Sequence, residues 1–283
     1  IQAYHVAIQF APPDDRSAQR KILSIYSLLE RWKECADFGR QWVEVKPDDS
    51  FRWLLVAPTL FLGSDQATYK THCNDMLESF NGSMAPGDAI NVCKACCLSP
   101  DVVELTRLPL AILVEALESE RPDESFAAGG WNARALVALR SDRAEEAIEF
   151  VLKSEESSTS PSAHALNFAI NALAKVELGR ISGALADFGK GSQALAALQT
   201  RFNPLPSHEQ LIAEIILREA KDSLDRLMPE GLPSFTQELP EMDPRDHLEL
   251  LLQFEVWDKA APIACQISEN LPAGNWRSQW ARS

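Results

Sequence analysis

The residues from Asp49 to Asp101 constrain the fold more than any other part of the chain. This stretch predicts three helices joined by short turns, and it shows almost none of the alternation that is typical of strands. The first helix, over 51–62, is apolar on nearly every side, which is typical of a helix buried between neighbours. Because a hairpin of such helices cannot bury its own apolar surface, we expect similar hairpins on both sides of it.

Similar helical patterns recur along the chain at a nearly constant spacing. Residues 3–15 resemble the second half of a hairpin that ends at Pro12, and a similar segment ends at Pro47, which lies 47 − 12 = 35 residues later. The turns at Asp142 and Gly179 are 179 − 142 = 37 residues apart. We therefore expect repeated units of two helices, and we expect the chain to begin in mid-repeat, as a fragment of a longer protein would.

A period near 34 residues with two helices per unit resembles the tetratricopeptide repeat. Large, small and helix-ending residues fall at the positions that this family uses in three units: Tyr26, Cys35 and Pro47; Trp131, Ala135, Ala138 and Ala147; Phe168, Ala172, Leu178, Gly179 and Ala184. The resemblance covers roughly residues 1–200 and implies an all-α fold, a right-handed superhelix of about five helical hairpins. We expect a closing helix over 208–227 to follow this array. The resemblance also implies that Trp131 is buried between hairpins.

Two prolines interrupt the repeat pattern in the middle of the chain. Pro58 and Pro109 fall inside predicted helices, where each removes a backbone donor. We expect each of them to kink its helix or to make it restart.

A finer resemblance concerns the segments RWLLVAPTLFLGSDQATYKTHCNDMLESF, KACCLSPD and RLPLA, together with the closing helix. They are similar to a sequence type found in large multidomain bacterial signalling proteins, where it follows a serine/threonine kinase domain or WD repeats. This resemblance implies that a signalling domain lies upstream of the fragment. The chain itself carries neither the glycine-rich loop nor the HRD motif of a kinase, so we do not expect it to be one.

The domain boundaries follow from proline content. We expect the repeat array to span 1–228, a linker to span 229–244, and a short helical pair with a tryptophan-containing tail to span 245–283. The linker is defined by four prolines within its length: Pro229, Pro233, Pro240 and Pro244.

The charge of the chain restricts its partners. The formal net charge is −14, and a surface this acidic repels phosphate backbones and anionic lipid heads, so we expect neither nucleic-acid nor membrane binding. No apolar run reaches the roughly 18 residues that a transmembrane helix needs. The six cysteines, at 35, 73, 93, 96, 97 and 265, are irregularly spaced, which favours reduced thiols and a cytoplasmic location.

Several residue clusters could carry chemistry, but each has a simpler structural interpretation. Cys93, Cys96 and Cys97 could bind zinc, yet no second cysteine pair accompanies them, and their apolar neighbours favour buried packing. His72 and Cys73 are adjacent on a helix and so point about 100° apart, which disfavours a catalytic pair. We therefore expect no catalytic residue, no bound metal and no cofactor. A thiol or metal enzyme built on the cysteine cluster remains a third alternative.

Two polar sets could line a groove. The first is a stripe at helical spacing, formed by His164, Asn167, Asn171 and Lys175, for which a solvated or interhelical hydrogen-bonded face is the competing interpretation. The second follows from the register of the repeats, because one position on the first helix of each unit commonly grips peptide in this family. Ordinary surface arginine is the competing interpretation of this second set, which contains Arg20, Arg52, Asn132 and Arg140.

The resemblance and the basic set together predict a function. We expect a non-catalytic protein-interaction module that holds a peptide or protein partner in a concave groove, within a larger signalling protein such as a serine/threonine kinase. Arginine binds carboxylates through two parallel hydrogen bonds, so the expected partner carries an acidic segment or a C-terminal carboxylate. The alternative is a structural spacer or a self-association region.

Overall fold

The computed structural model describes residues 16–63, 66–82, 84–119, 124–157, 160–199 and 206–228. These residues form an all-α fold, as the sequence predicts. The α-helices, with one 3-10 turn before α7, are α2 (Arg16–Leu28), α3 (Trp32–Val45), α4 (Ser50–Gly63), α5 (Gln66–Ser79), α6 (Pro86–Cys96), η1 (Leu105–Arg107), α7 (Leu110–Leu117), α8 (Glu124–Arg140), α9 (Ala144–Ser157), α10 (Pro161–Glu177), α11 (Ile181–Gln199) and α12 (His208–Leu227). The expected linker at 229–244, the appendage at 245–283 and the half-hairpin before Asp15 lie outside the described residues.

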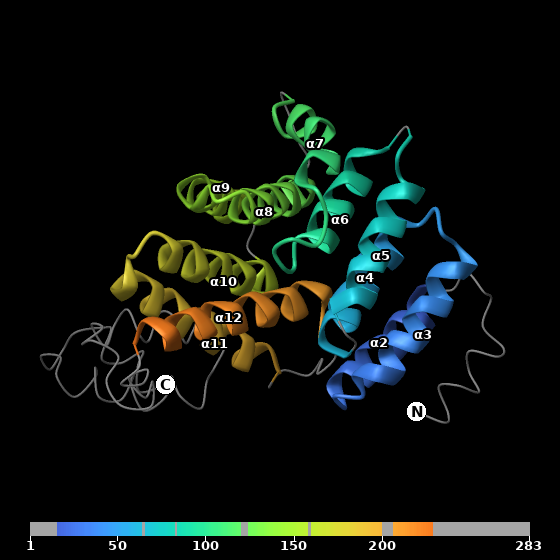
Figure 1. Cartoon of the computed structure of the whole chain (residues 1–283), viewed down its shortest axis with the longest axis horizontal. Helices are drawn as coiled ribbons and strands as arrows, with labels where there is room; N and C mark the ends of the chain where they lie inside the picture. The colour runs from blue at the N-terminus through green and yellow to red at the C-terminus, as the bar shows by residue number, and fades with distance from the viewer. Residues whose placement is uncertain are drawn as a thin grey trace, which may run out of the picture.

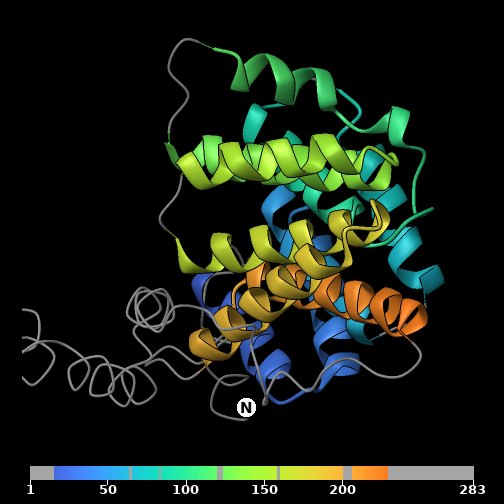
Figure 2. The same ribbon diagram turned by 90° about the vertical axis from the view of Figure 1, so that its left-hand side faces the viewer.

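Consecutive helices pack as pairs, which confirms the expected hairpins. The pairs are α2–α3, α4–α5, α6–α7, α8–α9 and α10–α11, and neighbouring pairs contact each other through α3–α4, α4–α6, α6–α8 and α9–α10. Figure 1 shows the pairs following one another from α2–α3 to α10–α11, and Figure 2 shows α7, α8 and α10 one above another. A right-handed superhelix stays a prediction, because these pairings do not fix the hand.

Tight turns separate the helices of three pairs. Glu30, Asp142 and Gly179 each have a positive φ, of 52°, 56° and 69°, in the short turns after α2, α8 and α10. A left-handed residue at this point ends a helix and reverses the chain, and glycine adopts that conformation without strain. The 37-residue spacing of Asp142 and Gly179 therefore marks equivalent turns of two repeats.

The two prolines in the middle of the chain behave differently. Pro109 precedes the first residue of α7, where its missing N–H costs no helical hydrogen bond, so the expected restart occurs there. Pro58 lies inside α4, which continues from Ser50 to Gly63 without restarting. The neighbours of Pro58 are fully buried, and this packing maintains the helix despite the lost hydrogen bond.

Helix α12 lies inside the fold rather than at its end. A capping box starts it, because the Ser207 hydroxyl accepts a hydrogen bond from the Gln210 backbone N–H while the Gln210 side chain accepts one from the Ser207 N–H. The helix then contacts α10 and α11 on one side and α4 on the other, and in Figure 1 it crosses the molecule between them. Its buried face consists of Leu211, Ile212, Ala213, Ile215, Ile216, Leu217, Ala220 and Leu224.

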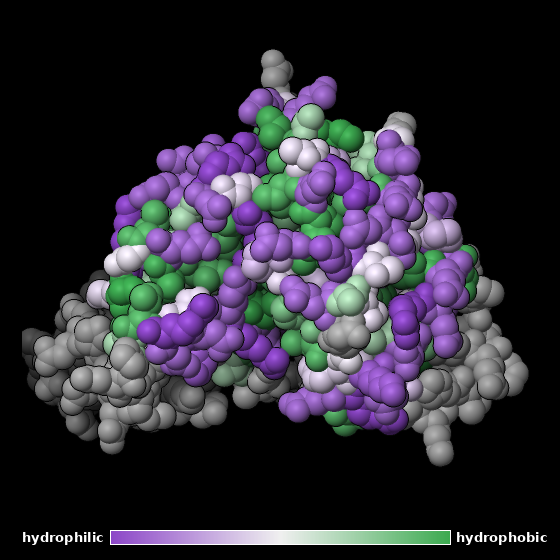
Figure 3. Space-filling view, in the orientation of Figure 1, coloured by the Kyte–Doolittle hydropathy of each residue, from purple (hydrophilic) through white to green (hydrophobic). Residues whose placement is uncertain are grey.

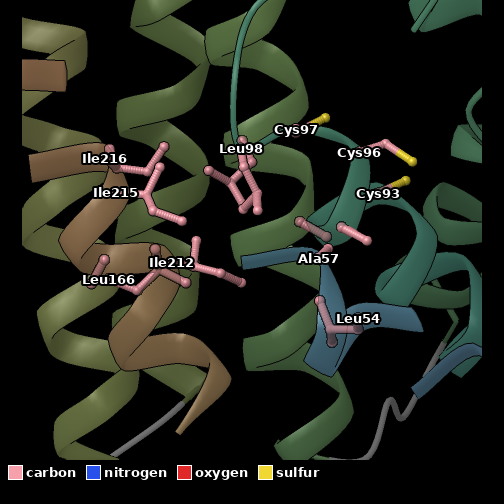
Figure 4. Packing of buried hydrophobic residues seen from close by; sticks show 14 of the residues in the cluster. Leu54, Ala57, Cys93, Cys96, Cys97, Leu98, Leu166, Ile212, Ile215 and Ile216 are labelled. Carbon is pink, nitrogen blue, oxygen red and sulfur yellow. The ribbon is translucent and has the colours of Figure 1, made fainter. Parts of the chain in front are cut away.

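The larger of two apolar clusters runs through the pairs and joins them to α12, and the smaller one contains Val176, Ala184 and Leu224. Figure 4 shows Ile212, Ile215 and Ile216 of α12 facing Leu98, which follows α6, whereas the sulfur atoms of the neighbouring cysteines point away from α12. Ile212 and Leu98 are fully buried. The centre of the fold is therefore the contact between α12 and the first helices of the pairs.

Replacing Ile212 with alanine tests this arrangement. The change removes buried methyl groups from the centre of the cluster, so Ile212→Ala should lower the free energy of unfolding by about 2–5 kcal/mol in urea denaturation. The control is Leu227→Ala at the exposed end of the same helix, which should change it by less than about 0.5 kcal/mol. Equal effects of the two substitutions would contradict the central position of α12.

Candidate functional site

The candidate site is the surface that holds α12. The first helices of four pairs contribute one residue each: Phe51 of α4, Lys94 of α6, Arg140 of α8 and Ser162 of α10. We call these four residues the α12-binding surface. Each contacts a side chain of α12, so the surface is a series of polar and aromatic contacts around the apolar centre.

Arg140 makes the most extensive of these contacts. Its guanidinium donates to both carboxylate oxygens of Glu219, with nitrogen–oxygen distances of 2.8 and 2.7 Å. The same side chain donates to the backbone carbonyls of Cys97 and Leu98, at 3.0 and 2.8 Å. Only 4% of the Arg140 side chain is exposed. Arg140 thus joins the end of α6 to the middle of α12, in the two-bond geometry that makes arginine selective for carboxylates.

Glu209 makes the second charged contact, near the start of α12. One of its carboxylate oxygens accepts a hydrogen bond from the Lys94 ammonium at 3.2 Å, and the other accepts one from the Ser162 hydroxyl at 2.9 Å. Burial alone would raise the pKa of this carboxyl, but the Lys94 charge, the charge of His208 and the two hydrogen bonds bring the pKa down to about 2. Glu209 is therefore ionised and links α6, α10 and α12.

An aromatic contact completes the surface at the end of α12 nearest to α4. The imidazole of His208 packs edge-on against the Phe51 ring, with 5.6 Å between ring centroids. Burial lowers the pKa of His208 to about 4, so the imidazole is neutral at pH 7. Close by, the Ser24 hydroxyl of α2 donates to the Pro206 carbonyl at 3.4 Å. The start of α12 thus contacts both of the first two helix pairs.

The basic set expected from the repeat register does not form one exposed face, and this part of the prediction was wrong. Arg52 is fully buried, where it donates to Asp49 at 3.2 Å and to the Trp42 carbonyl at 3.1 Å. Asn132 is also fully buried and donates to the Ser154 hydroxyl at 2.9 Å. The physical reason is that α4 and α8 are packed on several sides, so polar residues on them bond within the fold.

The other two members of the basic set have different surroundings. Arg20 is exposed, and its guanidinium carbon lies 6.0 Å from the Phe51 ring centroid. Arg140 does bind a carboxylate, as arginine at this position was expected to do, but that carboxylate belongs to Glu219 of the same chain. The structure therefore places Arg20 beside Phe51 near the start of α12 and Arg140 at the middle of that helix, whereas Arg52 and Asn132 are buried in their own pairs.

Sequence reasoning missed Lys94, Glu209 and Glu219. A weak signal existed for Lys94, because it is the one charged residue between Ala89 and Pro100 in an otherwise mostly apolar stretch. A buried lysine normally has an ionic partner. Nothing in the sequence identifies that partner, because Glu209 lies 115 residues away.

The polar stripe on α10 does not line a groove. Asn167 and Asn171 are buried, and burial lowers the pKa of the half-buried His164. The Lys175 ammonium donates to Asp187 of α11 at 2.5 Å. The interhelical interpretation of the stripe is therefore supported at Lys175.

The cysteine cluster lies in the core. Cys93, Cys96 and Cys97 are buried and form no disulfide. Burial raises the pKa of the Cys97 thiol to about 12 and that of Cys93 well above its usual value, and a hydrogen bond with Cys73 together with burial raises that of Cys96. Across residues 16–63, 66–82, 84–119, 124–157, 160–199 and 206–228, no group of three His, Cys, Asp or Glu side chains is placed to hold a metal ion.

The tripeptide Asp-Phe-Gly, which protein kinases use to bind magnesium, occurs twice in this chain, at 37–39 and at 187–189. Both copies lie inside helices, α3 and α11, each the second helix of its pair. Asp187 pairs with Lys175, and a Cβ atom at Gly39 would lie 2.9 Å from the Val56 side chain of α4. In this fold the tripeptide is a helix-packing element of the repeat.

No protein-family model and no curated protein matches this chain. Among the described helices, none combines the length and the apolar character needed to cross a membrane.

The reactivity of the core thiols tests their burial. In a Cys265→Ser variant only the five described cysteines remain, and their burial should keep them from reacting with a disulfide reagent at pH 8 until the protein is unfolded. The measurement is a thiol titration before and after denaturation. Rapid reaction of Cys93, Cys96 or Cys97 in the native protein would contradict this prediction, and so would stoichiometric zinc by elemental analysis.

The buried His72 predicts a dependence of stability on pH. Its Nε2 lies 3.1 Å from the Trp53 carbonyl, and burial lowers its pKa to about 4, whereas an unfolded histidine has a pKa near 6.5. Its stabilising contribution is therefore complete above pH 6.5 and is lost as the pH falls towards 4. We expect the fall in unfolding free energy between pH 7 and 5 to be about 2 kcal/mol smaller in His72→Gln than in the wild type. Identical falls would show that His72 is not buried in its neutral form.

Proposed function

We propose that the chain is a non-catalytic protein-interaction module that recognises a helix carrying carboxylates. The observation that supports the proposal most directly is the fit of α12 to the α12-binding surface. An amphipathic helix lying in a groove is a recurring mode of protein recognition, in which apolar residues supply affinity and polar contacts set orientation. The proposed partner is a helix with an apolar stripe and acidic residues at the positions of Glu209 and Glu219.

The spacing of the contacts supports a specific register for such a helix. Glu209 and Glu219 are ten residues apart, which is about 2.8 helical turns, so their side chains leave the helix about 80° apart, and both are partly buried against the pairs. Lys94 of the α6–α7 pair binds Glu209, and Arg140 of the α8–α9 pair binds Glu219. A partner helix displaced by one turn would leave both buried cations without a carboxylate, at a high cost.

A rigid spacer is the second candidate function, and the same packing favours it. Helix α12 packs against α4, α10 and α11, its Glu209 and Glu219 bind Lys94 of α6 and Arg140 of α8, and Pro206 just before it accepts a hydrogen bond from Ser24 of α2. In this second function α12 is a fixed part of the fold, and its contacts on several sides make the array rigid. The two functions differ in whether α12 can be replaced by another helix while the pairs remain folded.

The proposal includes the larger protein that contains this module and its location in the cell. The resemblance of this sequence to regions that follow kinase or WD-repeat domains supports a role within a larger signalling protein. The irregularly spaced, buried thiols support a cytoplasmic location.

Exchange of α12 in trans tests the proposal. A protease site is placed between Gln199 and Pro206 of the full chain, the chain is cut, and a fluorescent peptide spanning 206–228 is added. We expect the peptide to enter the cut protein, with retention of the helical circular-dichroism signal. A peptide with Glu209→Gln and Glu219→Gln should bind at least about tenfold more weakly, because both charge-assisted contacts are lost.

A matched control separates these contacts from general charge. Glu214→Gln removes one acidic group that pairs with Arg218 on the outside of α12, and it should leave the exchange unchanged. Unfolding of the pairs when α12 leaves, or failure of the peptide to enter, would favour the rigid spacer.

A further inference from the structure

Outside the α12-binding surface, a cluster of cationic and aromatic side chains joins α8 to α9. The rings of Trp131 and Phe150 stack with 5.8 Å between centroids and 22° between planes. The Arg134 guanidinium carbon lies 4.1 Å from the Phe150 centroid, and the Lys153 ammonium lies 4.6 Å from the Trp131 centroid. We call these four residues the Trp131 cluster. Each cation lies within the distance at which an aromatic face attracts it.

The cluster is accessible, contrary to the expectation that Trp131 is buried between hairpins. Trp131 and Arg134 are partly buried, Phe150 is almost fully buried and Lys153 is exposed. One cause is the length of α7, which has 8 residues, whereas α9 has 14, so the preceding pair covers only part of this side. Figure 3 shows hydrophobic residues reaching the surface around α7.

Neither cation of the cluster is paired within the part of the chain that the structure describes. Arg134 and Lys153 make no ion pair and no hydrogen bond there, although Glu118 and Glu146 are near enough to influence Arg134. Glu146 is already bound by Arg143, at 2.8 Å. The stacked guanidinium of Arg134 therefore has N–H donors on its edge that can bind a carboxylate in the plane of the group.

The next helix pair shows what is missing from the cluster. Phe168 and Lys190 occupy the positions of Trp131 and Lys153, since 168 − 131 = 37 and 190 − 153 = 37, and the Lys190 ammonium again lies over the ring, at 5.7 Å. The equivalent of Phe150 is Asp187, since 187 − 150 = 37, and Asp187 binds Lys175. The α10–α11 pair thus contains a carboxylate and its lysine partner where the α8–α9 pair has Phe150 and Ala138, and it has Asn171 where the α8–α9 pair has Arg134.

We propose that the Trp131 cluster is a docking site for an acidic segment of a partner protein, in which Arg134 and Lys153 each receive one side-chain carboxylate. Charge complementarity selects this occupant, because the two cations of the cluster have no ion-pair partner among the described residues and the cluster itself contains no carboxylate. The aromatic pair holds both cations in place, so less freedom is lost on binding. The chain has a net charge of −14, but at physiological salt the Debye length is about 8 Å, so distant acidic groups are largely screened.

Peptide binding to the full chain tests the site. The probe is a fluorescein-labelled hexapeptide, Glu-Leu-Glu-Glu-Leu-Glu, with an amidated C-terminus, and the measurement is fluorescence anisotropy. We expect the wild type to bind the probe and the variant Arg134→Gln with Lys153→Gln to bind it at least about tenfold more weakly, because two charge-assisted contacts are lost. The glutamine counterpart of the probe should not bind.

A matched variant controls for the overall charge. Lys33→Gln with Arg40→Gln removes the same charge from exposed positions on α3 and should change the affinity by less than about twofold, since salt screens distant charges. Thermal melting of both variants, followed by circular dichroism, shows whether either fold has changed. Equal loss in the two variants, or no binding to the wild type, would overturn the proposal.

Two further experiments distinguish an acidic segment from other possible ligands of the Trp131 cluster. A neutral peptide with a free C-terminal carboxylate that bound as well as the probe would replace side-chain carboxylates with a chain terminus as the ligand. A dimer in sedimentation that disappears in Arg134→Gln with Lys153→Gln would identify a second copy of this chain as the occupant. Because the site does not include α12, its failure would leave the exchange of α12 unaffected.

Discussion

The contact of Arg140 with Glu219 is the interaction on which the arrangement of the array depends. It joins α8 to α12, and through the carbonyls of Cys97 and Leu98 it also joins the end of α6. Removing both charges from water costs free energy, so a pair like this adds little net stability compared with apolar residues of the same shape. Its effect is on specificity, because the two-bond geometry fixes the rotation and the position of α12 along its axis.

The position of α12 changes the character of the repeat fold. In an open solenoid each unit contacts only its neighbours, and stability is a sum of local terms. Here α12 meets α4 through His208 and α10 through Glu209, and Pro206 just before it bonds to α2, so units distant in sequence share one core. A helix at this position, whether α12 or a partner helix in its place, therefore stabilises the first helix pair as well as the last.

The local parts of this fold could be predicted from the sequence, whereas the long-range parts could not. The helix over 51–62 can be predicted because its apolar residues continue on every side, and the expected kink or restart occurs as a restart at Pro109, whereas α4 continues past Pro58. Arg52 was placed on a surface because only its repeat position was known, yet Asp49 and the Trp42 carbonyl bind it inside. Lys94 and Glu209, or Arg140 and Glu219, are 115 and 79 residues apart, and no local pattern pairs them.

Comparison of equivalent positions supplies information that a single repeat lacks. The turns at Asp142 and Gly179, and the pairs Trp131–Lys153 and Phe168–Lys190, show that two units share one plan with a period of 37 residues. In the α8–α9 unit Phe150 occupies the position that Asp187 has in the α10–α11 unit, so the side chain differs although the position in the helix pair is the same. An internal carboxylate neutralises cations within its own unit, whereas a phenyl ring holds them in place by cation–π attraction and leaves their donors available. A repeat that carries a cation beside an aromatic pair, with no internal carboxylate to bind it, therefore has a surface with unsatisfied charge, and binding a partner satisfies such a surface without further change in the fold.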